Sequence, residues 1–61
     1  MNITELTEII KDCDNRATVD YREDTESYVV KTEYADEVCE LLSENYIDIV
    51  DVSSHSVSFY L

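Results

Sequence analysis

The chain contains no glycine and no proline in its 61 residues. Its turns and helix ends must therefore be built from residues such as Asn, Asp and Ser, whose short side chains hydrogen-bond to the nearby backbone. The same absence excludes glycine-rich loops that hold phosphate groups and proline-rich linkers. The periodicity of the apolar residues is thus the main guide to the fold.

The first segment with helical periodicity covers residues 4–13. Its apolar residues follow the i, i+3, i+4, i+7 spacing that places side chains on one face of a helix; they are Leu6, Ile9, Ile10 and Cys13. Two arrangements can cap its start: Asn2 with Glu5, or Thr4 with Thr7 and Glu8. A second helix is predicted at about 35–45, and its core face carries Val38, Leu41 and Leu42.

Four other segments alternate apolar and polar residues or are rich in β-forming residues. They cover residues 17–22, 27–33, 47–52 and 56–61. A polar turn at 23–26 joins the first two and a turn at 53–55 joins the last two, so each pair is predicted to form a hairpin. The predicted order is αββαββ in a single domain, residues 1–61, because a chain this short supports one core at most.

A shift of 32 positions aligns the two predicted helices. The aligned pairs are Leu6 with Val38, Ile9 with Leu41, Ile10 with Leu42, Glu5 with Glu37, Glu8 with Glu40, and Asp12 with Glu44. Acidic amphipathic helices share part of this pattern by chance, so coincidence and a true repeat both stay open. A true repeat predicts an α+β fold in which two αββ halves form one four-stranded, mainly antiparallel sheet with both helices on one face.

The last predicted strand lies in a segment, Ser53 to Leu61, that carries no acidic or basic residue apart from His55. Because an unprotected edge strand of this kind pairs readily with other chains, we expect it either to be a central strand or to meet another chain, as in a homodimer. Tyrosine is favoured in interfaces, and Tyr60 is predicted to point away from Val57, Phe59 and Leu61, if those face the helices, and toward a partner. The alternative role for the tyrosines is core packing.

Fifteen Asp and Glu residues against four Lys and Arg give a formal net charge of −11. This charge disfavours direct binding to nucleic acid or to an anionic membrane, because both are repelled at long range. A basic protein partner is favoured, and adaptation to a high-salt cytoplasm is the competing explanation. The sequence shows no targeting segment and no run of about 20 apolar residues for a membrane span, so we expect a soluble, cytoplasmic protein.

The acidic residues of the two predicted helices form two rows. One row is Glu5, Glu8 and Asp12, and the other is Glu37, Glu40 and Glu44. Successive carboxylates in a row are separated by roughly 5–7 Å along the helix axis, which is similar to the ~6–7 Å between neighbouring phosphates of nucleic acid. Further acids are predicted to add to this surface: Glu23, Asp24, Glu26, Glu33 and Asp36. The alternative is that these are ordinary solvated helix faces.

Enzymatic chemistry and metal binding find little support in the sequence. His55 is the only histidine and lies in a predicted turn, where no nucleophile and base are held together. Residues 12–23 resemble a calcium loop in part, but Arg16 and Ala17 stand where an oxygen ligand and a glycine are needed. We therefore expect no enzyme activity, no cofactor and no metal site.

Three functions fit these patterns. The first is an acidic inhibitor or regulator, encoded by a virus or mobile element, that mimics DNA and occupies the surface of a nucleic-acid-binding protein. The second is a small domain of a halophile whose acidity serves solubility. The third is a protein-interaction module that docks a partner through its open sheet face or last strand.

Overall fold

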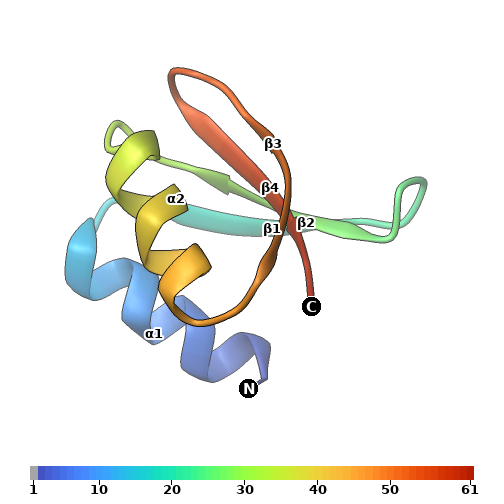
Figure 1. The fold of residues 1–61 in the computed structure, drawn as a ribbon, viewed down its shortest axis with the longest axis horizontal. Coiled ribbons are helices and arrows are strands. Elements are labelled where there is room, and N and C mark those ends of the chain that lie inside the picture. The colour runs from blue at the N-terminus through green and yellow to red at the C-terminus, as the bar shows by residue number, and fades with distance from the viewer. Residues whose placement is uncertain (1) are drawn as a thin grey trace.

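Two helices pack on one face of a four-stranded antiparallel sheet in the computed structural model, which describes residues 2–61 (Figure 1). The elements in chain order are α1 (Ile3–Cys13), β1 (Thr18–Arg22), β2 (Ser27–Lys31), α2 (Ala35–Glu44), β3 (Asp48–Val52) and β4 (Ser56–Tyr60). The predicted α+β fold and its αββαββ order are confirmed, with element ends within two residues of those expected from the sequence.

The start of α1 is capped by Asn2, one of the two arrangements that the sequence allowed. The Asn2 side-chain oxygen accepts a hydrogen bond of 2.9 Å from the Glu5 backbone N–H, and the Asn2 amide donates to the Glu5 carboxylate at 3.3 Å. These bonds satisfy a backbone donor that the first turn would otherwise leave unpaired. Leu6 and Ile10 are fully buried against the sheet and α2.

The sheet has the strand order β1-β2-β4-β3, with all neighbours antiparallel. This order has an approximate two-fold relation, in which α1, β1 and β2 correspond to α2, β3 and β4. The edge strands β1 and β3 show the same alternation of burial, with only their second residue half-buried, while β2 and β4 are largely buried. The chain therefore consists of two αββ halves.

The uncharged strand β4 lies in the centre of the sheet and is paired on both sides. The central placement is the first of the two outcomes expected from its sequence, and it removes the exposed edge that a homodimer would have protected. Val57 and Phe59 point to the helices and are fully buried, whereas Leu61 is half-exposed beyond the strand. Tyr60 lies on the opposite face, opposite Asp48 of β3, and its side chain is 46% exposed.

The core lies between the helices and the inner face of the sheet. Its fully buried side chains are Leu6, Ile10, Val30, Val38, Leu42, Val57 and Phe59. The ring of Tyr28 stacks on Phe59 with centroids 5.6 Å apart and also meets Tyr21 at 4.9 Å. Residues paired across antiparallel strands share a face, so the outer face carries mainly polar side chains, among them Thr18, Asp20, Lys31, Asp51 and Ser58, together with Val29 and Tyr60.

The end of α2 places a non-glycine residue in the left-handed conformation, because the chain contains no glycine. The Ile47 N–H donates to the Leu42 carbonyl at 3.0 Å and the Tyr46 N–H donates to the Ser43 carbonyl at 3.0 Å. These are the two bonds of a Schellman motif, whose penultimate residue must be left-handed and is usually glycine. Here that residue is Tyr46, with φ of 60° and a side chain that is 96% exposed.

We expect Tyr46→Gly to stabilise the protein by about 1 kcal/mol, because glycine adopts positive φ without the steric cost of a Cβ atom. The exposed tyrosine ring contributes little packing that would be lost. Thermal unfolding measures the effect, and Tyr46→Ala is the control because it removes the ring but keeps Cβ. Equal melting temperatures for the glycine and alanine variants would contradict this reading of Tyr46.

Candidate functional site

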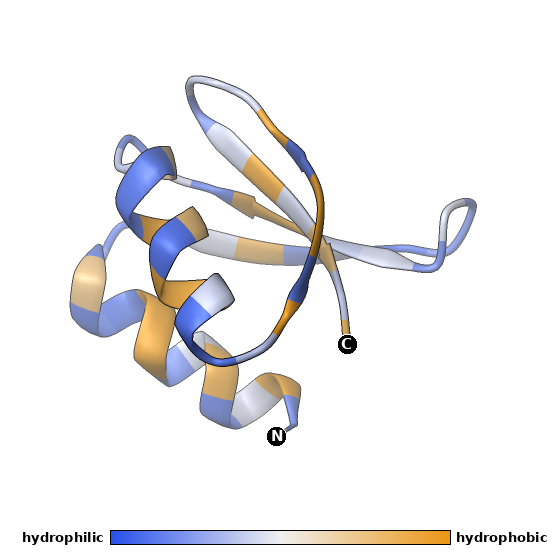
Figure 2. Cartoon of the chain, in the orientation of Figure 1, coloured by the Kyte–Doolittle hydropathy of each residue, from blue (hydrophilic) through white to orange (hydrophobic). Residues whose placement is uncertain are grey.

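The outward faces of the two helices form an acidic surface. Seven carboxylates lie on it, all exposed: Glu5, Glu8, Asp12, Asp36, Glu37, Glu40 and Glu44. Lys11 is the one basic residue within the ranges of α1 and α2. Figure 2 shows the hydrophilic residues on the outer sides of both helices and the apolar ones toward the sheet. We call these seven residues the acidic helix face.

The two acidic rows lie on neighbouring helices that run in roughly opposite directions (Figure 1). Cys13, the last residue of α1, has its sulfur 3.9 Å from a carboxylate oxygen of Glu37 in the first turn of α2. Glu37 therefore borders the seam between the helices.

Burial raises the pKa of the Cys13 thiol, and the negative charge of nearby Glu37 raises it further. A thiol with a raised pKa stays protonated at neutral pH and is a poor nucleophile. Cys13 and Cys39 are both half-buried free thiols. Cys13 thus packs at the helix seam and offers no reactive group there.

The structure separates the other acids of the expected partner surface from this face. Glu23, Asp24 and Glu26 lie in the β1–β2 turn, which projects beyond the sheet on the side away from the helices (Figure 1). Tyr60 lies on the outer face of the sheet. The helix rows are therefore brought together, whereas a partner lying flat on them would not also reach Tyr60, because the sheet stands between.

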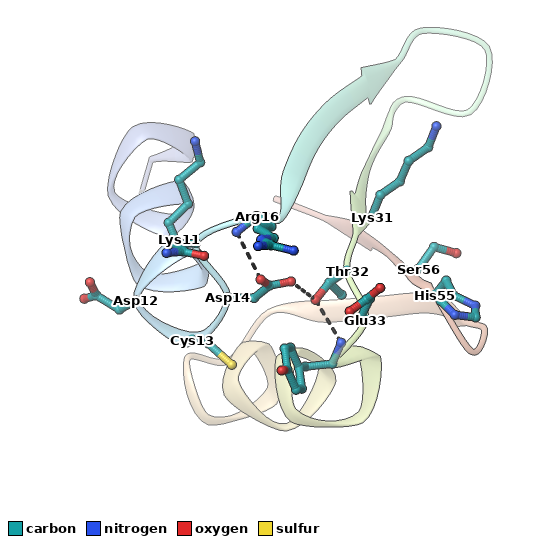
Figure 3. Close-up of a pocket in the computed structure, with 12 residues that line it drawn as sticks. Lys11, Asp12, Cys13, Asp14, Arg16, Lys31, Thr32, Glu33, His55 and Ser56 are labelled. Carbon is teal, nitrogen blue, oxygen red and sulfur yellow. Dashed lines mark hydrogen bonds between the residues drawn. The ribbon is translucent and has the colours of Figure 1, made fainter.

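A second surface was not foreseen from the sequence. A groove with a volume of about 1000 Å³ opens where the ends of α1 and β2 meet the β3–β4 turn. Three of the four Lys and Arg residues and the only histidine line it: Lys11, Arg16, Lys31 and His55. Figure 3 shows Lys11 and Lys31 extending to the same side, with Arg16 between them in this view, while Asp12 points away. We call this the cationic groove.

Asp14 forms the floor of the cationic groove and is itself buried. One of its carboxylate oxygens accepts the Thr32 hydroxyl at 2.6 Å, and the other accepts the Arg16 backbone N–H at 3.0 Å. The Thr32 hydroxyl oxygen in turn accepts the Tyr34 N–H at 3.0 Å. These bonds connect the α1–β1 loop to the β2–α2 loop and hold the groove residues in place (Figure 3).

The hydrogen bond from Thr32, helped by the Arg16 backbone N–H, lowers the pKa of Asp14. A carboxyl whose folded pKa is lowered stabilises the fold above its unfolded pKa of about 3.9 and loses that contribution as the pH falls below it.

We therefore expect Thr32→Val to lower the free energy of unfolding at pH 7 by about 1–3 kcal/mol, because the buried carboxylate loses a donor. The difference between the variant and the wild type should narrow as the pH falls below about 3.9, where Asp14 becomes protonated first in the unfolded chain and, at lower pH, in the folded protein. Denaturant unfolding at both pH values measures this. Thr18→Val, at an exposed strand position, is the control, and an equal loss in both variants would contradict the role of Thr32.

The residues of the cationic groove come from three separate parts of the chain, which explains why sequence reasoning missed them. Lys11 lies in the last turn of α1, Arg16 just before β1, and Lys31 at the end of β2. The signal that could have found them is that three of the four cations fall at element ends, which the αββαββ topology brings to one side of the molecule.

Comparison of the chain with protein-family models, curated proteins and solved structures found no match. Within residues 2–61, no group of three or more His, Cys, Asp or Glu side chains is arranged to hold a metal ion. Neither helix of the described part is long and apolar enough to cross a membrane. The two surfaces are therefore interpreted from their own geometry and charge.

Proposed function

We propose that this chain is a small binding protein that uses its acidic helix face to occupy the nucleic-acid surface of a basic protein, and thereby inhibits or regulates that protein. The observation that carries the proposal is the arrangement of seven exposed carboxylates, with a single lysine, on two adjacent helices. A folding role for these carboxylates is small, because exposed charges contribute little to stability.

The spacing of the two rows supports mimicry of a phosphate backbone. Carboxylates three or four residues apart on a helix are separated by roughly 5–6 Å along its axis, and packed helices have axes about 8–10 Å apart. A surface of arginines and lysines that binds successive phosphates would therefore meet carboxylates at similar intervals. Arginine binds carboxylate and phosphate groups in the same bidentate geometry.

Two other functions have less support. Docking through the open sheet face has less support because that face is mainly polar, with Tyr60 as its half-exposed aromatic side chain, and strand addition at β4 is disfavoured because β4 is paired on both sides. Adaptation to high salt predicts that the protein loses stability at low ionic strength, where repulsion between carboxylates is poorly screened. A melting temperature measured across a salt series separates that explanation from partner recognition.

The proposal is tested by passing bacterial and eukaryotic lysates over the immobilised protein and eluting with a salt gradient. We expect a basic nucleic-acid-binding protein to elute at moderate salt, because charge contacts dominate its retention. An identical column carrying a variant with reversed helix charges should not retain it. Equal retention on both columns, or retention of no basic protein, would count against the proposal.

A further inference from the structure

The cationic groove holds three of the four Lys and Arg residues of the chain and is formally neutral, whereas the rest of the chain is strongly acidic. Among its lining residues three are basic and three are acidic, while the remainder of the chain carries twelve acidic residues and one basic residue, Arg22. Of the three lining acids, Asp12 points away and Asp14 is engaged by Thr32 and the Arg16 backbone (Figure 3). Glu33 is the remaining carboxylate.

The cationic side chains of the groove are available to a ligand. The hydrogen bonds drawn among the lining residues use the Asp14 carboxylate, the Thr32 hydroxyl and two backbone N–H groups, and none uses the side chain of Lys11, Arg16 or Lys31 (Figure 3). Tyr34 also lines the groove, and its side chain is 50% exposed. Three cations from separate parts of the chain and the side chain of Tyr34 thus line one open groove.

We propose that the cationic groove binds a phosphate monoester whose organic part includes an aromatic ring, of the size of a nucleoside monophosphate. Two ammonium groups and one guanidinium provide several N–H donors along one side of the groove, and such donors suit a phosphate of about two negative charges with three accepting oxygens. The ring of Tyr34 provides a surface on which a flat ring can stack. The volume of the groove suits a ligand of this size.

The net charge of −11 limits the site to small anions. At physiological ionic strength the screening length is about 8 Å, whereas the molecule measures 26 × 24 × 18 Å. The acids of the β1–β2 turn are therefore largely screened from the groove, and the charged residues that line it, the three cations and Glu33 among them, determine what binds there. A polynucleotide would extend past the groove toward the acidic helix face and would be repelled.

The test is an NMR titration of the ¹⁵N-labelled protein with adenosine monophosphate, inorganic phosphate and adenosine at physiological ionic strength. We expect adenosine monophosphate to saturate shifts at the groove residues, and inorganic phosphate to shift the same residues with lower affinity. Adenosine alone should bind more weakly than the monophosphate. If no saturable shifts arise with millimolar monophosphate, or if they arise outside the groove, the proposal is wrong.

Variants separate a specific site from general charge. Arg16→Gln combined with Lys31→Gln should weaken binding of adenosine monophosphate at least tenfold, because two of three charged contacts are lost. Arg22→Gln, which removes the basic residue outside the groove, is the control and should leave affinity within about twofold. Glu33→Gln should tighten binding, since it removes the remaining repulsive carboxylate. Equal losses in the groove variant and the control would overturn the proposal.

Discussion

Reversal of Glu8, Glu40 and Glu44 to Lys should weaken binding to a basic partner by roughly 10²–10⁴-fold, which corresponds to about 3–6 kcal/mol. Each exposed ion pair at an interface contributes up to about 1 kcal/mol, and reversal replaces the attraction with a similar repulsion. These three carboxylates are exposed, and none takes part in a side-chain hydrogen bond within residues 2–61. The fold should therefore tolerate the change, and titration calorimetry with the captured partner measures it.

The matched control reverses Glu23, Asp24 and Glu26 in the β1–β2 turn to Lys. Both triple variants change the net charge by the same amount, but the turn projects away from the helices (Figure 1). We expect the turn variant to retain affinity within about tenfold, because it alters long-range attraction and leaves direct contacts intact. Equal losses in the two variants would show that total charge, and not the acidic helix face, determines binding.

Phe59→Ala should lower the free energy of unfolding by about 3–5 kcal/mol, which is a large part of the total stability. Phe59 is fully buried on the inner face of β4, where it stacks on Tyr28. Truncation of a buried phenylalanine costs about 3–5 kcal/mol, whereas a domain of 61 residues is stable by about 3–9 kcal/mol in total. Circular dichroism during thermal unfolding measures the loss.

Tyr60→Ala is the control for Phe59→Ala. Tyr60 is the next residue in β4, but it lies on the outer face and is 46% exposed, so its truncation should cost about 1 kcal/mol or less. The comparison tests which face of the sheet holds the core. Melting temperatures that fall by the same amount in both variants would contradict the assignment of Phe59 to the core.

The apolar periodicity was sufficient to predict both helices, all four strands and their pairing into two halves. Leu6 and Ile10 in α1, and Val38 and Leu42 in α2, are fully buried as their spacing predicted. The strand order was less accessible, because β2 and β4 are neighbours although 24 residues separate Lys31 from Ser56. The uncharged sequence of β4 was the one signal that it belonged in the centre of the sheet.

Features that depend on contacts between distant residues could not be read from the sequence. The sequence predicted that Asp14 ends the first helix, but it did not predict that Asp14 is buried. Its carboxylate accepts a hydrogen bond from the Thr32 hydroxyl, 18 residues away in the sequence. Tyr46 gave no sign of positive φ, since that conformation is imposed by the end of α2 in a chain without glycine. The cationic groove escaped notice for the same reason, because its residues converge only in three dimensions.

The most direct test of the central claim is a competition between this protein and duplex DNA for the captured partner. Fluorescence anisotropy of a labelled duplex bound to the partner is followed while the wild-type chain or the helix-reversed variant is added. We predict that the wild type releases the DNA fully and that the helix-reversed variant does not. If the wild type binds the partner while the DNA stays bound, the acidic helix face does not occupy the nucleic-acid surface and the account is wrong.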